Sequence, residues 1–357
     1  MKRRDFICGA GLSALGLLLG CSDRSQSDRT ATVNQPPSFA VIETRPHVTP
    51  SRIHWLDSSL EKLGSTEINH AAAGDYSRLA VMGEKLFLAP TGPTGRNDDR
   101  VLLSVELGSS RVTEYALEAI NNYCVAASNG NAFVGGNLNF SSHISKVELA
   151  DGAASSLTLS GLILDSIIAN DSNLFAFAWE DIDGKVSSSL LTFDLDLNEI
   201  SRIPLNDCGY CTFRPRILGD KLFIPSWTSI ATQNSRSNTL GIYDIASGEL
   251  EVIELEKPVL EAIPTDDGLV VVHGDIHQAS SARTEIVLLD HGSWTAKSEG
   301  TLPYHAVQVE ILNNELCALD SQDALHLVTI DGKWEERLSS AVDLTLDDSH
   351  ISSFCAV

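Results

Sequence analysis

Basic side chains are scarce in this sequence. The chain has 25 Lys and Arg residues against 48 Asp and Glu residues, and its formal net charge is −23. A surface with this balance repels nucleic acid and anionic lipid. The composition therefore excludes nucleic acid as a partner and favours a soluble domain beside a membrane.

Familiar catalytic motifs are also missing. The sequence contains no Gly-x-Ser-x-Gly elbow, no phosphate-binding loop, no His-Glu-x-x-His motif and no well-placed carboxylate pair. We therefore predict no cofactor. A long amphipathic helical pattern is absent after residue 21 as well, and the chain is predicted to be all-β.

The first 20 residues have the pattern of an export signal. A basic head with Arg3 and Arg4 precedes a weakly apolar stretch that ends at Gly20 and is too short to span a bilayer. Arg3-Arg4 followed by Asp5-Phe6-Ile7 resembles the twin-arginine motif, whose machinery exports folded proteins. A general secretory signal that happens to hold two arginines is the alternative.

Leu18-Leu19-Gly20-Cys21 resembles the bacterial lipobox, in which the cysteine is acylated and becomes the new N-terminus. Several acyl chains anchor a protein durably, at about 0.8 kcal/mol per buried methylene. The alternative for Cys21 is an ordinary core cysteine. We expect a cleaved signal at 1–20, a lipidated and disordered tether at 21–37, and a folded domain at 38–357 on the periplasmic or extracellular side of a bacterial membrane. Cleavage removes three basic residues and one acidic residue, which leaves a net charge of −25.

One short pattern recurs seven times along the folded domain. It is an apolar, strand-like segment that ends in an acidic residue, and the spacings between these acids are 49, 42, 46, 50, 46 and 41 residues. The seven acids are Asp57, Glu106, Glu148, Asp194, Asp244, Asp290 and Asp331. Upstream of six of them, a turn of Asn, Asp or Gly precedes a second apolar run, as in Asn129-Gly130 before Ala132-Phe133-Val134.

Each repeat therefore predicts four short antiparallel strands, which is the unit of a β-propeller blade. The segment Ile242-Tyr243-Asp244-Ile245-Ala246-Ser247-Gly248 resembles the blade signature of quinoprotein and YVTN propellers. That resemblance covers residues 38–357 and implies a seven-bladed propeller, but it brings no catalytic residues with it. The lone strand at 350–357 is predicted to complete the first blade and to close the ring.

Aromatic and basic residues gather in one sector of the predicted ring. Trp179 and Trp227 lie at the same point of adjacent blades, and the crossover between them runs from Asp207 to Arg216. The candidate ligand-binding residues are Trp179, Trp227, Tyr210, Arg214, His273, Asp275 and His277. The alternative is that both tryptophans cap the core at strand ends.

Five cysteines follow the lipobox, which leaves at least one unpaired in an oxidising compartment. Cys208 and Cys211 form a Cys-x-x-Cys motif, but a strand and not a helix is expected after it, so a loop-clamping disulfide is predicted in place of a redox centre. Free thiols or a metal site are the alternatives. The state of Cys124, Cys317 and Cys355 stays open.

His273, Asp275 and His277 would share one face of a strand, which is the arrangement that metal chelation needs. The segment is expected to be a loop, so metal binding there is a weak hypothesis. Two functions follow from the whole sequence. The first is an anchored binding or scaffolding module for an envelope protein or glycan, and the second is a propeller-type lactonase, hydrolase or cofactor-dependent dehydrogenase.

Overall fold

The computed structural model describes residues 35–45, 48–72, 79–90, 100–138, 141–231, 235–274 and 282–357. The chain divides between Thr30 and Ala31, and the second unit, Ala31–Val357, holds everything reported below. The predicted signal, the lipobox and most of the tether lie outside the described residues. Within those residues, no helix has the length and apolarity needed to cross a membrane.

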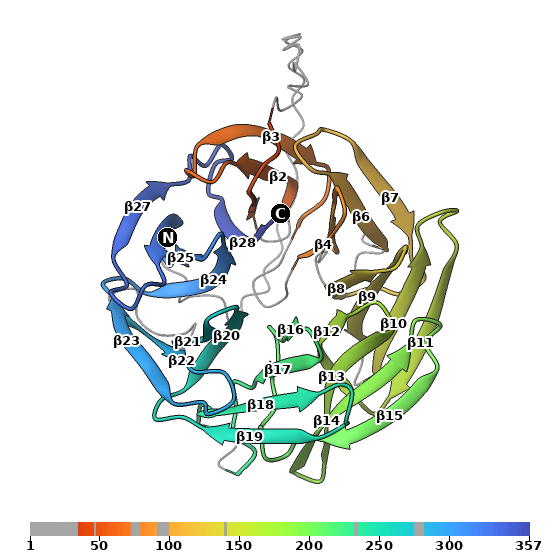
Figure 1. Ribbon diagram of the computed structural model, residues 1–357. Coiled ribbons are helices and arrows are strands. Elements are labelled where there is room, and N and C mark those ends of the chain that lie inside the picture. The colour runs from red at the N-terminus through yellow and green to blue at the C-terminus, as the bar shows by residue number, and fades with distance from the viewer. Residues whose placement is uncertain are drawn as a thin grey trace, which may run out of the picture. The chain divides into compact units, whose positions relative to one another are not determined.

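The second unit is an all-β, seven-bladed propeller, as predicted (Figure 1). Each blade is a sheet of four antiparallel strands, in which the first strand lies toward the middle of the ring and the fourth lies on the rim. Blade 1 consists of β28 (His350–Ala356), β1 (Phe39–Arg45), β2 (Val48–Leu56) and β3 (Lys62–Ile68). Blade 2 consists of β4 (Ala80–Met82), β5 (Lys85–Leu88), β6 (Val101–Glu106) and β7 (Val112–Ala116). Blade 3 consists of β8 (Asn122–Ser128), β9 (Asn131–Leu138), β10 (Ser141–Glu148) and β11 (Ala154–Ser160).

The remaining four blades follow the same order along the chain. Blade 4 consists of β12 (Ile163–Ala169), β13 (Asn173–Ile182), β14 (Lys185–Asp194) and β15 (Glu199–Pro204). Blade 5 consists of β16 (Arg216–Leu218), β17 (Lys221–Pro225), β18 (Thr239–Asp244) and β19 (Leu250–Glu254). Blade 6 consists of β20 (Val259–Thr265), β21 (Gly268–His273), β22 (Thr284–Leu289) and β23 (Ala296–Leu302). Blade 7 consists of β24 (Ala306–Leu312), β25 (Glu315–Asp320), β26 (Ala324–Thr329) and β27 (Glu336–Ala341).

The ends of the chain close the ring, which confirms the predicted composite blade. The C-terminal strand β28 pairs antiparallel with β1, from Phe39 opposite Ala356 to Thr44 opposite His350. The backbone N–H of Val357 also donates to the carbonyl of Ser38, at 3.0 Å. Because β28 takes the innermost place in blade 1, the first and last strands of the domain depend on each other.

Burial explains why the strands have the sequences they do. The second strand of each blade is covered on both faces, so it is almost continuously apolar, as in Leu269-Val270-Val271-Val272 of β21. The fourth strand lies at an edge and exposes most of its residues, as β15 and β27 do. The blades pack face to face through these apolar surfaces, and no blade buries its own faces alone.

The recurring acids have a local structural role. Asp57 and Asp194 each follow or end a third strand, and Oδ1 of each accepts backbone N–H groups two and four residues later. Oδ1 of Asp244 accepts the backbone N–H three residues later, and Oδ1 of Asp331 accepts the one two residues later. In these four blades the side chain fixes the turn between the third and fourth strands, which explains the aspartate there.

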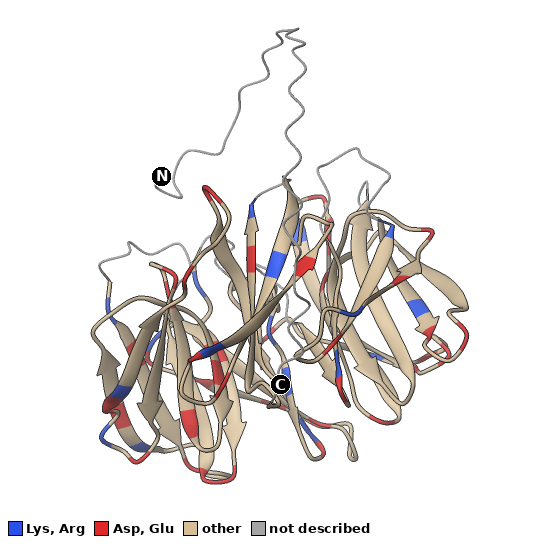
Figure 2. Ribbon diagram, turned by 90° about the horizontal axis from the view of Figure 1, so that it is seen from above, with Lys and Arg blue, Asp and Glu red and all other residues tan. Residues whose placement is uncertain are grey.

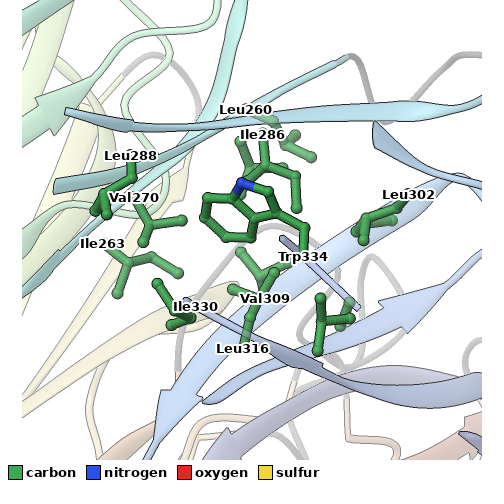
Figure 3. Packing of buried hydrophobic residues seen from close by; sticks show 14 of the residues in the cluster. Leu260, Ile263, Val270, Ile286, Leu288, Leu302, Val309, Leu316, Ile330 and Trp334 are labelled. Atoms are coloured by element: carbon green, nitrogen blue, oxygen red, sulfur yellow. The ribbon is translucent and has the colours of Figure 1, made fainter. Parts of the chain in front are cut away.

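The same turn places an apolar side chain against the neighbouring blade. In blade 7 this residue is Trp334, which packs among Leu260, Ile286 and Leu302 of blade 6 and Val309 of its own blade (Figure 3). Gly300 makes room for it, because a Cβ atom there would lie 2.3 Å from Trp334 Cδ1. The repeat thus joins adjacent blades as well as shaping its own.

A buried carboxylate holds the connection that leads into β28. Glu43 accepts hydrogen bonds from the backbone N–H groups of Thr345 and Leu346, both at 2.7 Å, and from the hydroxyls of Thr345 and Ser349. His54 Nε2 lies 2.7 Å from the same carboxylate. Burial alone would raise the pKa of Glu43, but these hydrogen bonds outweigh it and hold the pKa at about 2.

Replacing Glu43 should weaken closure of the ring. We expect Glu43→Gln to lower the free energy of unfolding by about 3 kcal/mol, because an amide cannot accept all of these bonds and its N–H atoms would face donors. In the wild type, the Glu43 contribution is complete above pH 4.5 and is lost as the pH falls toward 2. Urea unfolding at several pH values measures both effects. Glu67→Gln, an exposed partner of Arg52 in the same blade, is the control and should cost less than about 0.5 kcal/mol; equal losses would rule out this role.

Candidate functional site

The two faces of the ring differ in the connections they carry. Because the strands of a blade alternate in direction, the connections between second and third strands lie on the same face as the connections between blades. We call this the loop-rich face, and the other carries the short turns described above. Acidic side chains are spread over strands and turns of the ring and do not gather in one patch (Figure 2).

Bulges in the innermost strands present backbone groups to the preceding blade. One extra residue interrupts the pairing of β12, β20, β24 and β28 with its second strand. These residues are Asp165, Leu260, Val307 and Ser352. In β20, the Leu260 carbonyl accepts a bond from Trp227 Nε1 of blade 5, at 3.1 Å. In β12, the Leu164 carbonyl accepts a bond from Asn137 Nδ2 of blade 3, at 3.0 Å.

A buried ionic network joins blades 5, 6 and 7 near the middle of the ring. Arg216 binds Glu310 through Nη1, at 2.7 Å, and binds Glu261 through Nη2, at 3.1 Å. Arg214 forms a second ion pair with Glu261 and donates to the Val307 carbonyl. All four side chains are buried. Arg214, expected from the sequence to offer positive charge to a ligand, therefore directs that charge into the protein interior.

Asp165 is a buried carboxyl that binds the crossover between blades 4 and 5 at Thr212. Its Oδ1 accepts a bond from Trp179 Nε1, at 3.0 Å, and its Oδ2 accepts one from the backbone N–H of Thr212, at 2.9 Å. The backbone of Cys211 donates to it as well. Burial raises the pKa of Asp165 to about 7, although these hydrogen bonds oppose the shift.

The two candidate tryptophans have different surroundings. Trp227 is buried in the apolar cluster formed mainly by blades 6 and 7, edge-on to Phe213 with ring centroids 4.9 Å apart, so it caps the core. Trp179 is only partly buried, and its ring lies 5.3 Å from that of Tyr210 at an interplanar angle of 59°. The structure thus brings Trp179 and Tyr210 together at Asp165 and places Trp227 inside the core.

Cys208 and Cys211 both carry free thiols in the structure. Cys208 packs in the apolar cluster between blades 4 and 5, whereas Cys211 packs against the cluster that contains Trp227. Burial raises the pKa of each thiol to about 12, which makes both poor nucleophiles. The structure does not join these two residues, and the disulfide stays a prediction. Cys124 and Cys317 are buried thiols whose pKa values burial also raises.

His273 ends β21 on the loop-rich face, and its Nδ1 lies 3.1 Å from the Pro258 carbonyl. Burial lowers the pKa of His273, which favours the neutral ring. Asp275 and His277 lie outside the described residues, so the predicted metal ligands stay untested as a set. Among residues that the structure describes, no three His, Cys, Asp or Glu side chains converge as metal ligands.

A hollow of about 270 Å³ lies between the outer parts of blades 3 and 4. Leu157, Leu159 and Phe193 line it, and Glu180 and Arg202 contribute its polar groups. Arg202 is paired with Glu199 through two bonds. Because Glu180 and Trp179 point to opposite faces of β13, this hollow is separate from the Asp165 sector.

Sequence reasoning missed Asp165, Glu261 and Glu310. Each is an acid inside an otherwise apolar first strand, as in Ile163-Leu164-Asp165 and Val259-Leu260-Glu261. That interruption was the available signal, because an acid at the centre of a buried strand needs a partner.

Comparison with known proteins gives the fold and no closer relation. No protein-family model and no curated protein matches the sequence. Among solved structures, apo AztD from Citrobacter koseri has a TM-score of 0.55 and 10% identity, covering 90% of this chain and 98% of that one. BamB from Moraxella catarrhalis has a TM-score of 0.51 and 12% identity, covering 89% and 86%. The dihydro-heme d1 dehydrogenase NirN has a TM-score of 0.53 and 12% identity, covering 88% and 74%.

Breaking the ionic network should destabilise the protein far more than breaking an exposed pair. Arg216→Met would leave Glu310 and part of Glu261 buried without a cation, and we expect a loss of about 3–5 kcal/mol in the free energy of unfolding. Arg202→Met removes an arginine that is bonded just as closely to Glu199 but is exposed, and it should cost less than about 1 kcal/mol. Chemical denaturation of both variants makes the comparison; similar losses would contradict a structural role for the network.

Proposed function

We propose that this protein is an exported lipoprotein, tethered through Cys21, that binds an envelope protein or glycan with the loop-rich face of its propeller. The lipobox-like segment supports the anchor, and the positions of the exposed apolar side chains support the binding face. Three of the five exposed large aliphatic residues of the described chain lie on hairpins between second and third strands. They are Val48, Leu138 and Ile182, with exposed fractions of 44%, 45% and 60%.

The hairpin of blade 4 supports the proposal most directly. Strands β13 and β14 pair with each other as far as Ile182 and Lys185, whereas β12 pairs with β13 only as far as Trp179. On the other side, pairing with β15 begins at Ser189. Residues 180–187 therefore extend beyond their own sheet as a two-stranded ribbon that carries Ile182 near its tip. Ile182 therefore gives this protruding ribbon an exposed apolar side chain that a partner could cover.

A propeller-type enzyme is the second candidate. The fold is compatible with it, since one similar structure is a dehydrogenase in complex with DHE. Within this chain, the observation that favours an enzyme is the pKa of Asp165 near 7, the range in which a carboxyl can act as a general acid or base. Asp165 already bonds Trp179 and Thr212 and lies next to raised-pKa thiols, so the sector supports binding better than nucleophilic chemistry.

The anchor can be tested by removing the acylated thiol. Wild-type protein should fractionate with membranes and incorporate a labelled fatty acid, whereas Cys21→Ala should do neither, because no other residue of the lipobox can carry the lipid. Replacing Arg3 and Arg4 by lysine should block export if the twin-arginine route is used and should be tolerated by a general secretory signal. Membrane association of the Cys21→Ala protein at the wild-type level would overturn the anchoring model.

The binding face can be tested by photo-cross-linking in cells. A photoreactive residue in place of Ile182 should give one discrete adduct that survives mild solubilisation, because the hairpin tip would lie in the interface. The matched control replaces Asp171, which is exposed on the short turn between β12 and β13, on the opposite face of the same blade. Adducts of equal intensity from both positions, or from neither, would refute a specific loop-rich interface.

A further inference from the structure

Asp165 is a buried carboxyl with no cationic side chain beside it in the described residues. Asp320 faces His326, whose pKa is raised, and Glu261 and Glu310 face two arginines. Glu43 lies beside His54, whose pKa burial lowers, and is held by backbone N–H groups and hydroxyls. Asp165 is 5% exposed and accepts bonds only from the N–H groups of Trp179, Thr212 and Cys211. Its pKa is raised to about 7, whereas that of Glu43 is lowered to about 2, so the ionised form of Asp165 is poorly stabilised and would gain from a cation nearby.

The aromatic pair beside Asp165 supplies surfaces that suit a particular class of cation. Trp179 and Tyr210 are both partly exposed and meet at an angle of 59°, which gives two walls of π-electron density. Trp179 donates its indole N–H to Asp165, and this bond adds electron density to the ring that would face a cation. Aromatic faces and a carboxylate together are the groups that recognise alkylated ammonium ions.

Neighbouring charged and titratable groups act in both directions. The exposed Asp181 lies close enough to raise the pKa of Tyr210, after the effects of burial, Cys211 and Asp165. Tyr123 and Cys124, on β8, face Asp165 from blade 3, and both are neutral groups with raised pKa values. Arg236, on the connection between β17 and β18, lowers the pKa of the Cys211 thiol, and its positive charge opposes a cation at this site. The acidic protein as a whole attracts cations.

We propose that Asp165, Trp179 and Tyr210 form a binding site for an organic cation that carries an alkylated ammonium group of the choline type. This inference rests on the proposed function and names a ligand class for the loop-rich face. Trp179 and Tyr210 contact the methyl groups, and Asp165 supplies the opposite charge beneath them. A lipid headgroup and a free quaternary amine share this chemistry.

Binding of the cation is coupled to the protonation of Asp165. The pKa of about 7 means that the carboxyl is largely protonated at pH 6 and largely ionised at pH 8. A cation binds the ionised form, so binding releases a proton and lowers the pKa. The affinity should therefore rise about tenfold from pH 6 to pH 8.

The test titrates choline chloride into the full chain with Cys21→Ala, which carries no lipid, and follows tryptophan fluorescence at pH 6 and pH 8. The neutral isostere 3,3-dimethylbutanol is the ligand control. We expect choline to bind about tenfold more tightly than the isostere, and calorimetry in two buffers of different ionisation enthalpy to report proton release at pH 7. Equal binding of the two compounds, no binding of either, or an affinity that does not change with pH would overturn the site.

Three variants separate the site from general effects on folding. Asp165→Asn should weaken choline binding about tenfold and remove its pH dependence, and Trp179→Phe should weaken binding while the pH dependence stays. Trp294→Phe is the matched control, because Trp294 Nε1 also donates to a carboxylate, that of Glu251, at 3.0 Å in a different part of the ring. It should bind choline as the parent chain does. A parent-like affinity in Asp165→Asn would contradict the proposal.

Two further arms identify the source of the cation and keep this inference apart from the proposed function. Co-sedimentation with phosphatidylcholine vesicles, but not with phosphatidylglycerol vesicles, indicates a headgroup; binding of free choline without vesicle binding indicates a soluble amine. Either result supports the cation site. A protein that cross-links from Ile182 but does not bind choline loses the cation site alone, whereas choline binding without a cross-link leaves the site and removes the partner interface.

Discussion

The ring depends on polar contacts that cross from one blade to the first strand of the next. Apolar packing between blades is non-directional, so it cannot by itself fix how far each blade is rotated or displaced. The hydrogen bonds can: Trp227 binds the Leu260 carbonyl, Glu261 accepts the Val309 N–H, and Gln308 bonds both backbone groups of Phe354. The first strand of each blade has no partner strand on its inner side, so backbone groups there can bond the preceding blade, and the bulge in β20 presents the Leu260 carbonyl to Trp227.

Much of the fold could be predicted because its signals are local. An Asp that caps a turn acts within four residues, and an Asn-Gly hairpin acts within two, so both leave a trace in the local sequence. The first repeat lacks one strand, and this predicted that the last strand of the chain closes the ring. The ionic network left no such trace, since Arg216 and Glu310 are 94 residues apart and meet only because the ring brings their strands together. Local sequence patterns predicted the blades, whereas the pairing of the buried charges depends on the assembled ring.

The sequence predicted part of the candidate site, Trp179 and Tyr210, but not Asp165, for the same reason. Trp179 and Trp227 occupy equivalent points in adjacent blades, and the neighbouring sequence does not indicate which of them is buried. What separates them is the acceptor of the indole N–H. Trp227 of blade 5 donates to the Leu260 carbonyl, at the bulge in the first strand of the next blade, and is buried there. Trp179 donates to the carboxyl of Asp165, at the bulge in the first strand of its own blade, and stays partly exposed beside Tyr210.

The bulges in the first strands therefore have two roles. The carbonyls of the bulged residues Leu260 and Val307 accept bonds from Trp227 and Arg214, and their contribution is structural. The bulged residue Asp165 instead presents a carboxyl whose ionised form no cationic side chain of the described residues neutralises. Because an uncompensated buried charge costs stability, its presence next to exposed aromatic rings is understandable if the compensating cation comes from outside the chain.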